Sequence, residues 1–141
     1  MVRTIFCSAL MILCSLQNTE ARIGETEKQC IARYGEPVKY MEKGVLFIKD
    51  SMKIYVTFAQ GRADSIWLQK LDAAQPGRAL QISKEEIEKY LKANCSGYTW
   101  QYSTALPDGD VVWITKDSEL GALYSLSTCS LQVYTRDCIA K

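Results

Sequence analysis

Residues 52–70 read MKIYVTFAQGRADSIWLQK, and this stretch decides the fold. Apolar and polar side chains alternate along 52–59 and again along 63–70, which is the period of a half-buried β-strand. The polar residues between them, 60–62, include a glycine, as a tight turn requires. The sequence therefore predicts an antiparallel hairpin with one apolar face.

The same strand period returns elsewhere in the chain. Further strands are expected at Val45–Lys49, Tyr98–Ser103, Val111–Lys116, Ala122–Ser127 and Ser130–Arg136. Residues 72–81 have no apolar period and contain Pro76-Gly77, so we expect a linker there. Short polar turns join most neighbouring strands, which favours antiparallel pairing.

Two capping boxes mark the expected helices. Residues 26–29 (TEKQ) and 83–86 (SKEE) each place a hydroxyl residue three positions before a Glu or Gln, which satisfies the first backbone N–H groups of a helix. Gly35 ends the first helix after Tyr34, and Gly97 lies just beyond the second. Each helix carries a short apolar stripe, which has to be buried.

Helices and strands occur in the same order in both halves of the chain. Residues 22–71 and 82–141 each predict one short helix followed by three or four antiparallel strands, with the linker 72–81 between them. We therefore predict an α+β fold, a tandem pseudo-repeat in which the helices cover one face of each half's small sheet. The alternative is a single α+β unit whose halves are alike by chance.

Residues 1–21 have the features of a secretory signal. Arg3 supplies a positive start, residues 5–16 are apolar, and residues 19–21 (TEA) form a small-x-small cleavage site. A membrane anchor needs about 20 apolar residues, more than this run offers. Leu13 is too large to precede a lipidated Cys14. We expect a periplasmic or secreted protein with no membrane-spanning segment after cleavage.

Four cysteines remain after such cleavage, at Cys30, Cys95, Cys129 and Cys138. In an oxidising compartment disulfides are the default for an even set, and four cysteines allow three connectivities. Their order along the chain favours a disulfide between Cys95 and either Cys129 or Cys138, because these three lie in the same half of the chain. Wide spacing and the absence of histidine argue against a zinc site.

The composition limits the possible functions. The chain has no histidine, which excludes Ser-His-Asp and Cys-His enzymes and removes the commonest metal ligand. Its formal net charge is +1 with no block of like charges, so no nucleic-acid partner is expected. Asp108 and Asp110 flank a turn glycine, and the glutamates within residues 85–88 lie in the first turn of a helix. A structural role therefore accounts for these acidic residues without catalysis. We predict no catalytic residue, no metal and no cofactor.

Residues 24–37, GETEKQCIARYGEP, resemble the G-x-T-x-x-Q-V…G-x-P opening of the BamE/SmpA family of envelope proteins. In that family the motif caps a short helix that leads into a small antiparallel sheet. Two helix-plus-sheet units in tandem are also similar to the plan of β-lactamase inhibitor proteins, which bind their target through an open sheet face. These resemblances imply a fold and a tendency to bind proteins. The chain departs from BamE-type proteins because it lacks a lipobox.

Aromatic residues occupy the less apolar face of three expected strands. Tyr55 lies between Lys53 and Thr57, Trp67 between Ser65 and Gln69, and Tyr134 between Gln132 and Arg136. If the helices cover the other face, Tyr55, Trp67 and Tyr134 form an open face that binds a protein or an envelope component. Cross-strand packing, or a second core between the halves, is the alternative.

Two other functional interpretations stay open. A carbohydrate-binding module is one, because surface aromatics also stack on sugars, and a small carboxylate-based hydrolase using Asp108 or Asp110 is the other. Tyr98, Trp100 and Tyr102 alternate with polar residues and are expected in the core.

Overall fold

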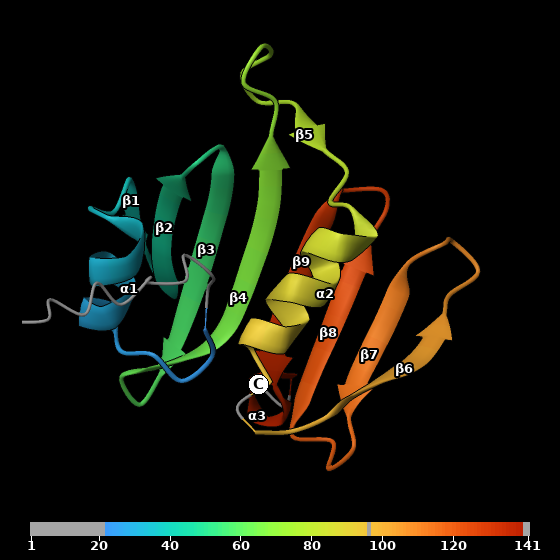
Figure 1. Ribbon diagram of the computed structural model, residues 1–141. Helices are drawn as coiled ribbons and strands as arrows, with labels where there is room; N and C mark the ends of the chain where they lie inside the picture. The colour runs from blue at the N-terminus through green and yellow to red at the C-terminus, as the bar shows by residue number, and fades with distance from the viewer. Residues whose placement is uncertain (1–21, 96, 140–141) are drawn as a thin grey trace, which may run out of the picture.

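The computed structural model describes residues 22–95 and 97–139, and its main feature is one antiparallel sheet (Figure 1). The expected signal sequence, residues 1–21, lies outside the described residues. The helices are α1 (Glu27–Tyr34), α2 (Lys84–Ala93) and α3 (Arg136–Ile139). The strands are β1 (Lys39–Met41), β2 (Gly44–Lys49), β3 (Met52–Ala59), β4 (Arg62–Leu71), β5 (Ala79–Leu80), β6 (Trp100–Ala105), β7 (Val111–Thr115), β8 (Leu120–Ser125) and β9 (Ser130–Thr135).

The expected tandem pseudo-repeat of two helix-plus-sheet units is wrong. A single nine-stranded sheet runs in the order β1-β2-β3-β4-β9-β8-β7-β6, with β5 paired to β4 at one end. The joining step is the antiparallel pair β4–β9, from Ser65 opposite Tyr134 to Gln69 opposite Ser130. Two separate sheets would each leave an edge of unpaired N–H and C=O groups at this place, and pairing β4 with β9 satisfies both edges.

The two capping boxes are confirmed as helix starts. Thr26 Oγ1 accepts a hydrogen bond from Gln29 N at 3.3 Å, and Gln29 Oε1 accepts one from Thr26 N at 2.9 Å. Ser83 and Glu86 exchange the same pair of bonds at 3.2 and 2.9 Å. The cap residues therefore fix where α1 and α2 begin.

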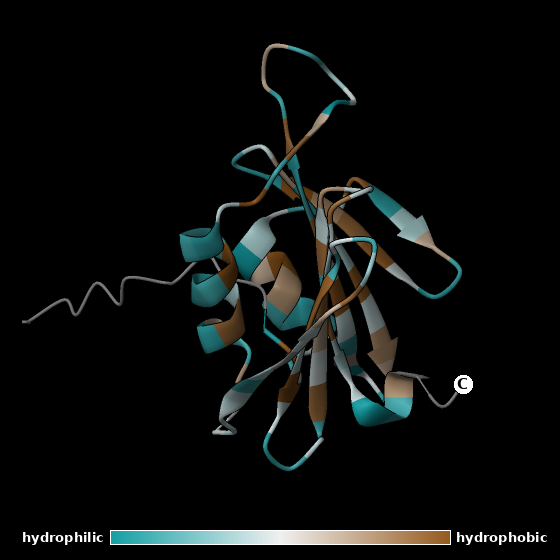
Figure 2. Ribbon diagram, turned by 90° about the vertical axis from the view of Figure 1, so that its right-hand side faces the viewer, coloured by the Kyte–Doolittle hydropathy of each residue, from teal (hydrophilic) through white to brown (hydrophobic). Residues whose placement is uncertain are grey.

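One face of the sheet forms the core together with α1 and α2. Fully buried side chains alternate along the central strands at Val56, Ile66, Leu68, Leu131 and Val133. The helices add Cys30 and Tyr34 from α1 and Ile87 and Leu91 from α2 to the same cluster. Figure 2 shows α1 and α2 on one side of the sheet and the short α3 on the other. The second face of the sheet is therefore not covered by the two longer helices.

Polar contacts hold α2 and its preceding segment against the sheet. The segment 72–81, expected as a linker, includes β5, in which Leu80 pairs with Lys70 of β4. Lys70 Nζ donates to Glu86 Oε1 at 2.7 Å, and this bond holds the pKa of the Glu86 carboxyl below its usual range. Ile82 N donates to the hydroxyl of Tyr124 on β8 at 3.2 Å.

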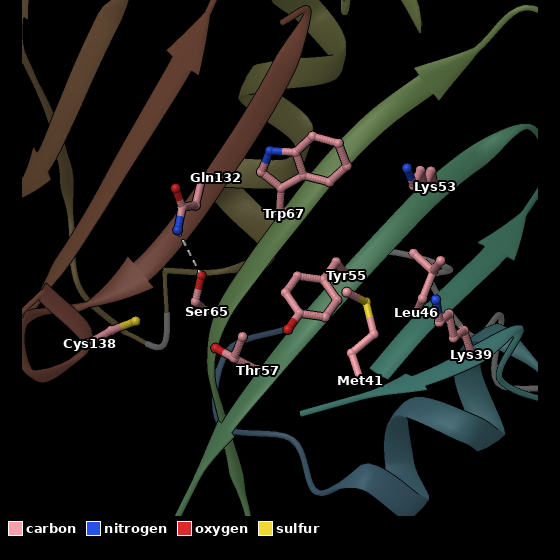
Figure 3. A pocket seen from close by; sticks show the side chains of 10 residues that line it. All are labelled: Lys39, Met41, Leu46, Lys53, Tyr55, Thr57, Ser65, Trp67, Gln132 and Cys138. Carbon is pink, nitrogen blue, oxygen red and sulfur yellow. Dashed lines mark hydrogen bonds between the residues drawn. The ribbon is translucent and has the colours of Figure 1, made fainter. Parts of the chain in front are cut away.

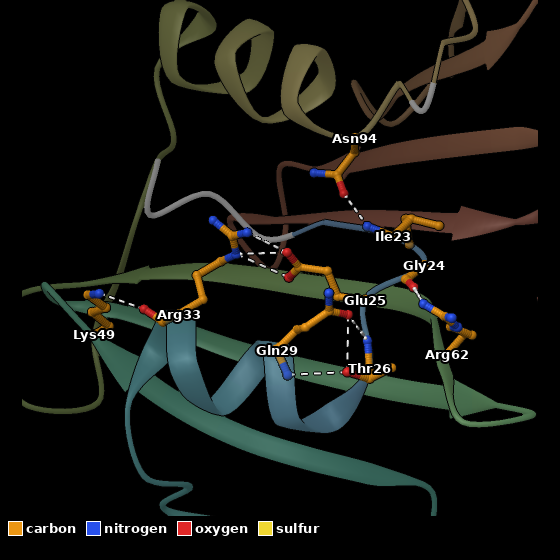
Figure 4. Close-up of polar contacts among 9 residues, drawn as sticks. All are labelled: Ile23, Gly24, Glu25, Thr26, Gln29, Arg33, Lys49, Arg62 and Asn94. Carbon is orange, nitrogen blue, oxygen red and sulfur yellow. Dashed lines mark hydrogen bonds and ion pairs between the residues drawn. The ribbon is translucent and has the colours of Figure 1, made fainter. Parts of the chain in front are cut away.

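Residues 22–25 connect α1, α2 and β4 (Figure 4). Ile23 N donates to Asn94 Oδ1 at 2.7 Å, and Gly24 N donates to Ala63 O at 2.8 Å. Glu25 forms an ion pair with Arg33 of α1, in which Arg33 Nε lies 3.0 Å from Glu25 Oε1. The hydrogen bond to Glu25 raises the pKa of Arg33 above its ordinary value. This pair anchors the start of the domain to its first helix.

We expect Glu25→Gln to destabilise the domain. The side chains of Arg33 and Glu25 are only 16% and 11% exposed, so the variant leaves a largely buried guanidinium without its carboxylate. The free energy of unfolding in urea should fall by about 3 kcal/mol. The double variant Glu25→Gln/Arg33→Met should recover part of that loss because it removes both charges. A single variant within about 0.5 kcal/mol of the wild type would contradict this prediction.

Candidate functional site

The candidate site is the open face of the sheet, on the side away from α1 and α2. Register places one row of side chains across this face, each opposite the next: Lys39, Leu46, Tyr55, Trp67, Gln132, Leu123, Val112 and Thr104. Tyr55 and Trp67 are direct cross-strand neighbours at the centre of the row. Antiparallel neighbours lie about 5 Å apart, so the two rings form one aromatic surface.

A groove of about 580 Å³ lies over this aromatic pair (Figure 3). We call it the open-face groove. It is lined by Lys39, Met41, Leu46, Lys53, Tyr55, Thr57, Ser65, Trp67, Gln132 and Cys138. These residues come from β1, β2, β3, β4, β9 and α3. Most of the lining comes from β1–β4, and the β4–β9 pairing completes the groove by adding Gln132 and Cys138.

One end of the open-face groove is apolar and basic. Met41 and Leu46 lie beside Tyr55, and the ammonium groups of Lys39 and Lys53 stand near them (Figure 3). Lys53 Nζ lies 5.6 Å from the centroid of the Trp67 ring, within the range of a cation–π contact. Among the residues that the structure describes, no aspartate or glutamate belongs to the groove lining. This end of the groove therefore combines aromatic area with two positive charges.

The other end of the groove is polar. Gln132 Nε2 donates to Ser65 Oγ at 3.0 Å, which ties β9 to β4 across the groove floor. Thr57 Oγ1 donates to Asp64 Oδ1 at 2.6 Å. The side chain of Cys138 reaches this end from α3. These groups offer hydroxyl, amide and thiol functions beside the aromatic pair.

Tyr134 lies on the same face but outside the groove lining. It is paired with Ser65 on β4 and with Gly121 on β8. A Cβ atom built on Gly121 would lie 2.3 Å from Cε2 of the Tyr134 ring, so the ring rests on bare backbone. Burial raises the pKa of Tyr134 above its ordinary value. Of the three aromatics expected at the site, the structure brings Tyr55 and Trp67 together and gives Tyr134 a packing contact with β8.

Sequence reasoning missed several residues of the groove. Lys39 and Met41 lie on β1, whose three residues are too few to show a strand period. Cys138 lies in α3, immediately after the strand that was expected to run to Arg136. Leu46 could have been found, because strand alternation places it on the face opposite Val45 and Phe47, which are buried.

The aromatic stripe expected in the core near α2 is partly wrong. Trp100 packs against the core and donates from Nε1 to Leu91 O at 2.5 Å. Tyr102, however, is 64% exposed and Tyr98 is 36% exposed. The reason is that β6 is an edge strand and α2 covers only its beginning. Trp113 packs against the core from β7.

None of the four described cysteines is joined to another in a disulfide. Cys30 is buried in α1, and burial raises the pKa of its thiol to about 12, so it stays protonated. Cys129 precedes β9 and Cys138 follows it, so the two lie at opposite ends of that strand. Pairing of Cys95 with Cys129 or Cys138 stays a prediction from the sequence.

The acidic groups considered for catalysis lie away from the groove. Asp108 Oδ1 accepts from Asp110 N at 3.1 Å, and Asp110 Oδ1 accepts from Leu126 N at 2.9 Å, so both carboxylates organise the turn between β6 and β7. In the described part of the chain, no cluster of three or more His, Cys, Asp or Glu could hold a metal. No helix within residues 22–95 and 97–139 is long and apolar enough to cross a membrane.

The contact between Tyr134 and Gly121 predicts that mutations at these two positions have coupled effects on the free energy of unfolding. Gly121→Ala places a methyl group where the ring lies, and we expect it to lower the free energy of unfolding by about 1–2 kcal/mol. In a Tyr134→Ala background the same methyl group has room, so Gly121→Ala should cost much less. Urea denaturation of the four proteins measures this coupling, and strictly additive effects would contradict it.

Comparison with known proteins does not identify a family. No protein-family model matches the chain, and no curated protein matches it. Its fold is similar to the crystal structure of a cysteine-rich secretory protein from Staphylococcus aureus subsp. aureus Mu50, with a TM-score of 0.47 and 13% identity. That match covers 84% of this chain and 44% of the other, so the chain spans less than half of that protein's length.

Proposed function

We propose that this chain is an exported, non-enzymatic domain that binds a protein or another envelope component through its open-face groove. The observation that carries the proposal is the adjacent pair Tyr55 and Trp67, placed side by side on a sheet face that α1 and α2 leave uncovered. The domain would leave the cytoplasm by means of residues 1–21 and act after their removal.

The aromatic pair has the properties of a binding centre. Aromatic side chains bury a large area with few rotatable bonds, and they are enriched among residues that dominate binding energy. Trp67 is already held by its strand and by the Lys53 ammonium, so little further ordering is needed on binding. The groove's volume of about 580 Å³ also falls in the usual range of ligand sites.

Sugar binding is a second candidate because it would use the same surface. Tyr55 and Trp67 could stack on a pyranose ring, and the amide of Gln132, which is only partly buried, could form hydrogen bonds with its hydroxyl groups. A carboxylate-based hydrolase that uses Asp108 or Asp110 receives no support at this groove, since neither residue belongs to its lining. A soluble glycan that quenches tryptophan fluorescence in the wild type and not in Trp67→Ala would favour the sugar-binding candidate.

The proposal predicts that aromatic variants lose a partner while keeping the fold. Residues 22–141 serve as the bait that captures binding partners from the envelope or secretion fraction of the source cells. The captured proteins are identified by mass spectrometry. Tyr55→Ala/Trp67→Ala should weaken the binding of a wild-type partner by at least about 30-fold, the size expected for a central aromatic contact. Tyr102→Ala, on an exposed residue of β6, is the matched control and should bind normally.

Thermal unfolding decides whether the comparison is valid. Trp67 lies on the open face and is only partly buried, so Trp67→Ala should keep a cooperative melt with a loss of roughly 1 kcal/mol. Loss of the cooperative transition would instead make Trp67 a core residue and overturn the proposed site. A partner that binds the folded double variant as tightly as the wild type would overturn it as well. Adding Tyr134→Ala tests whether the third aromatic contributes.

A further inference from the structure

We infer that the groove receives an extended acidic segment of a partner protein, with a carboxylate near Lys39 and Lys53 and an apolar side chain on Tyr55 and Trp67. This inference rests on the proposed function and adds the chemistry of the ligand. It follows from the distribution of charge in the groove, from the groove's length and from the position of its apolar floor.

Both lysines lie at one end of the groove. Lys39 pairs with Leu46 on β2, and Leu46 pairs with Tyr55 on β3. Lys53 lies two residues before Tyr55 on the same strand and therefore on the same face. Figure 3 shows the two ammonium groups on either side of Leu46. A carboxylate bound in this part of the groove would be attracted by both.

Neither lysine has an acidic partner in the described part of the chain, and no carboxylate lines the groove. Lys70, on the same strand as Trp67 but at its far end, is paired with Glu86. Lys53 instead lies over the Trp67 ring, which keeps its ammonium group at the groove. Asp64 accepts from Thr57 at the opposite, polar end of the groove, so the end that holds both lysines is the positive one, where a cationic segment is repelled and an acidic one attracted.

The length of the groove fits an extended chain. Its lining runs from β1 across β2, β3 and β4 to β9, which are neighbours in the sheet. Four steps of about 4.8 Å make roughly 19 Å. An extended chain advances about 3.3 Å per residue, so about six residues cross the groove. The apolar floor at Leu46, Tyr55 and Trp67 lies beneath the first half of that path. Gln132, which is only partly buried, can bind a peptide group in the second half.

The test uses three pools of fluorescein-labelled, end-capped peptides of about six residues. All alternate Phe or Leu with a second residue type, which is Asp or Glu in the acidic pool, Asn or Gln in the amide pool and Lys in the basic pool. Binding to the mature chain is measured by fluorescence anisotropy. The acidic pool should bind roughly tenfold more tightly than the amide pool at low salt, and the advantage should shrink at high salt. The basic pool should bind most weakly.

Charge variants assign that preference to the groove. Lys39→Gln/Lys53→Gln should reduce binding of the acidic pool to the level of the amide pool. Lys28→Gln/Lys92→Gln changes the net charge equally on exposed residues of α1 and α2 and should leave the preference unchanged. Tyr55→Ala/Trp67→Ala should weaken binding of both pools.

The remaining outcomes separate this inference from the proposed function. Equal binding of the acidic and amide pools, lost in Tyr55→Ala/Trp67→Ala, would overturn charge selection and leave the binding groove standing. If no peptide pool binds, but a captured partner is still lost in Tyr55→Ala/Trp67→Ala, then the inference of an extended acidic segment is overturned and the proposed binding function stands. Binding of phosphatidylglycerol vesicles without peptide binding would overturn it in favour of a membrane surface. A captured partner that binds Tyr55→Ala/Trp67→Ala as tightly as the wild type would overturn both proposals.

Discussion

The pairing of β4 with β9 is the interaction on which the rest of the structure depends. It joins strands that are separated by most of the second half of the chain, and it places Trp67 opposite Gln132 and Ile66 opposite Val133. The first pair extends the open-face groove onto β9, and the second continues the core. A slip of one residue in this register would exchange the two faces of β9, burying Gln132 and exposing Val133. The same register therefore determines both stability and the site.

Two glycines, Gly44 on β2 and Gly121 on β8, allow close packing at the open face of the sheet. A Cβ atom on Gly44 would lie 2.1 Å from the backbone oxygen of Val56, so no side chain fits between β2 and β3 at that level. Gly121 leaves room for the ring of Tyr134 in the same way. At both positions the missing side chain lets a neighbouring group approach the backbone, the Val56 carbonyl at Gly44 and the Tyr134 ring at Gly121.

Local rules in the sequence were enough to predict the two longer helices, most of the strands and the face of many side chains, but they missed β1, β5 and α3. Capping boxes located α1 and α2, and alternation placed Tyr55 and Trp67 on one face, because both signals depend only on neighbouring residues. Pairing between distant strands has no such signal, so the single sheet replaced the expected tandem pseudo-repeat. For the same reason Gln132 and Cys138 could not be assigned to a groove that β3 and β4 begin.

The acidic side chains near the core are engaged in holding the helices in place. Glu25 binds Arg33 on α1, and Glu86 binds Lys70 beneath α2, so these carboxylates neutralise positive charge on the helix-covered side of the sheet. At the groove, by contrast, Lys39 and Lys53 have no carboxylate beside them among the described lining residues. A formal net charge of +1 conceals this asymmetry. Selection of a partner by charge would therefore depend on the local field of the groove, because the molecule as a whole exerts almost none.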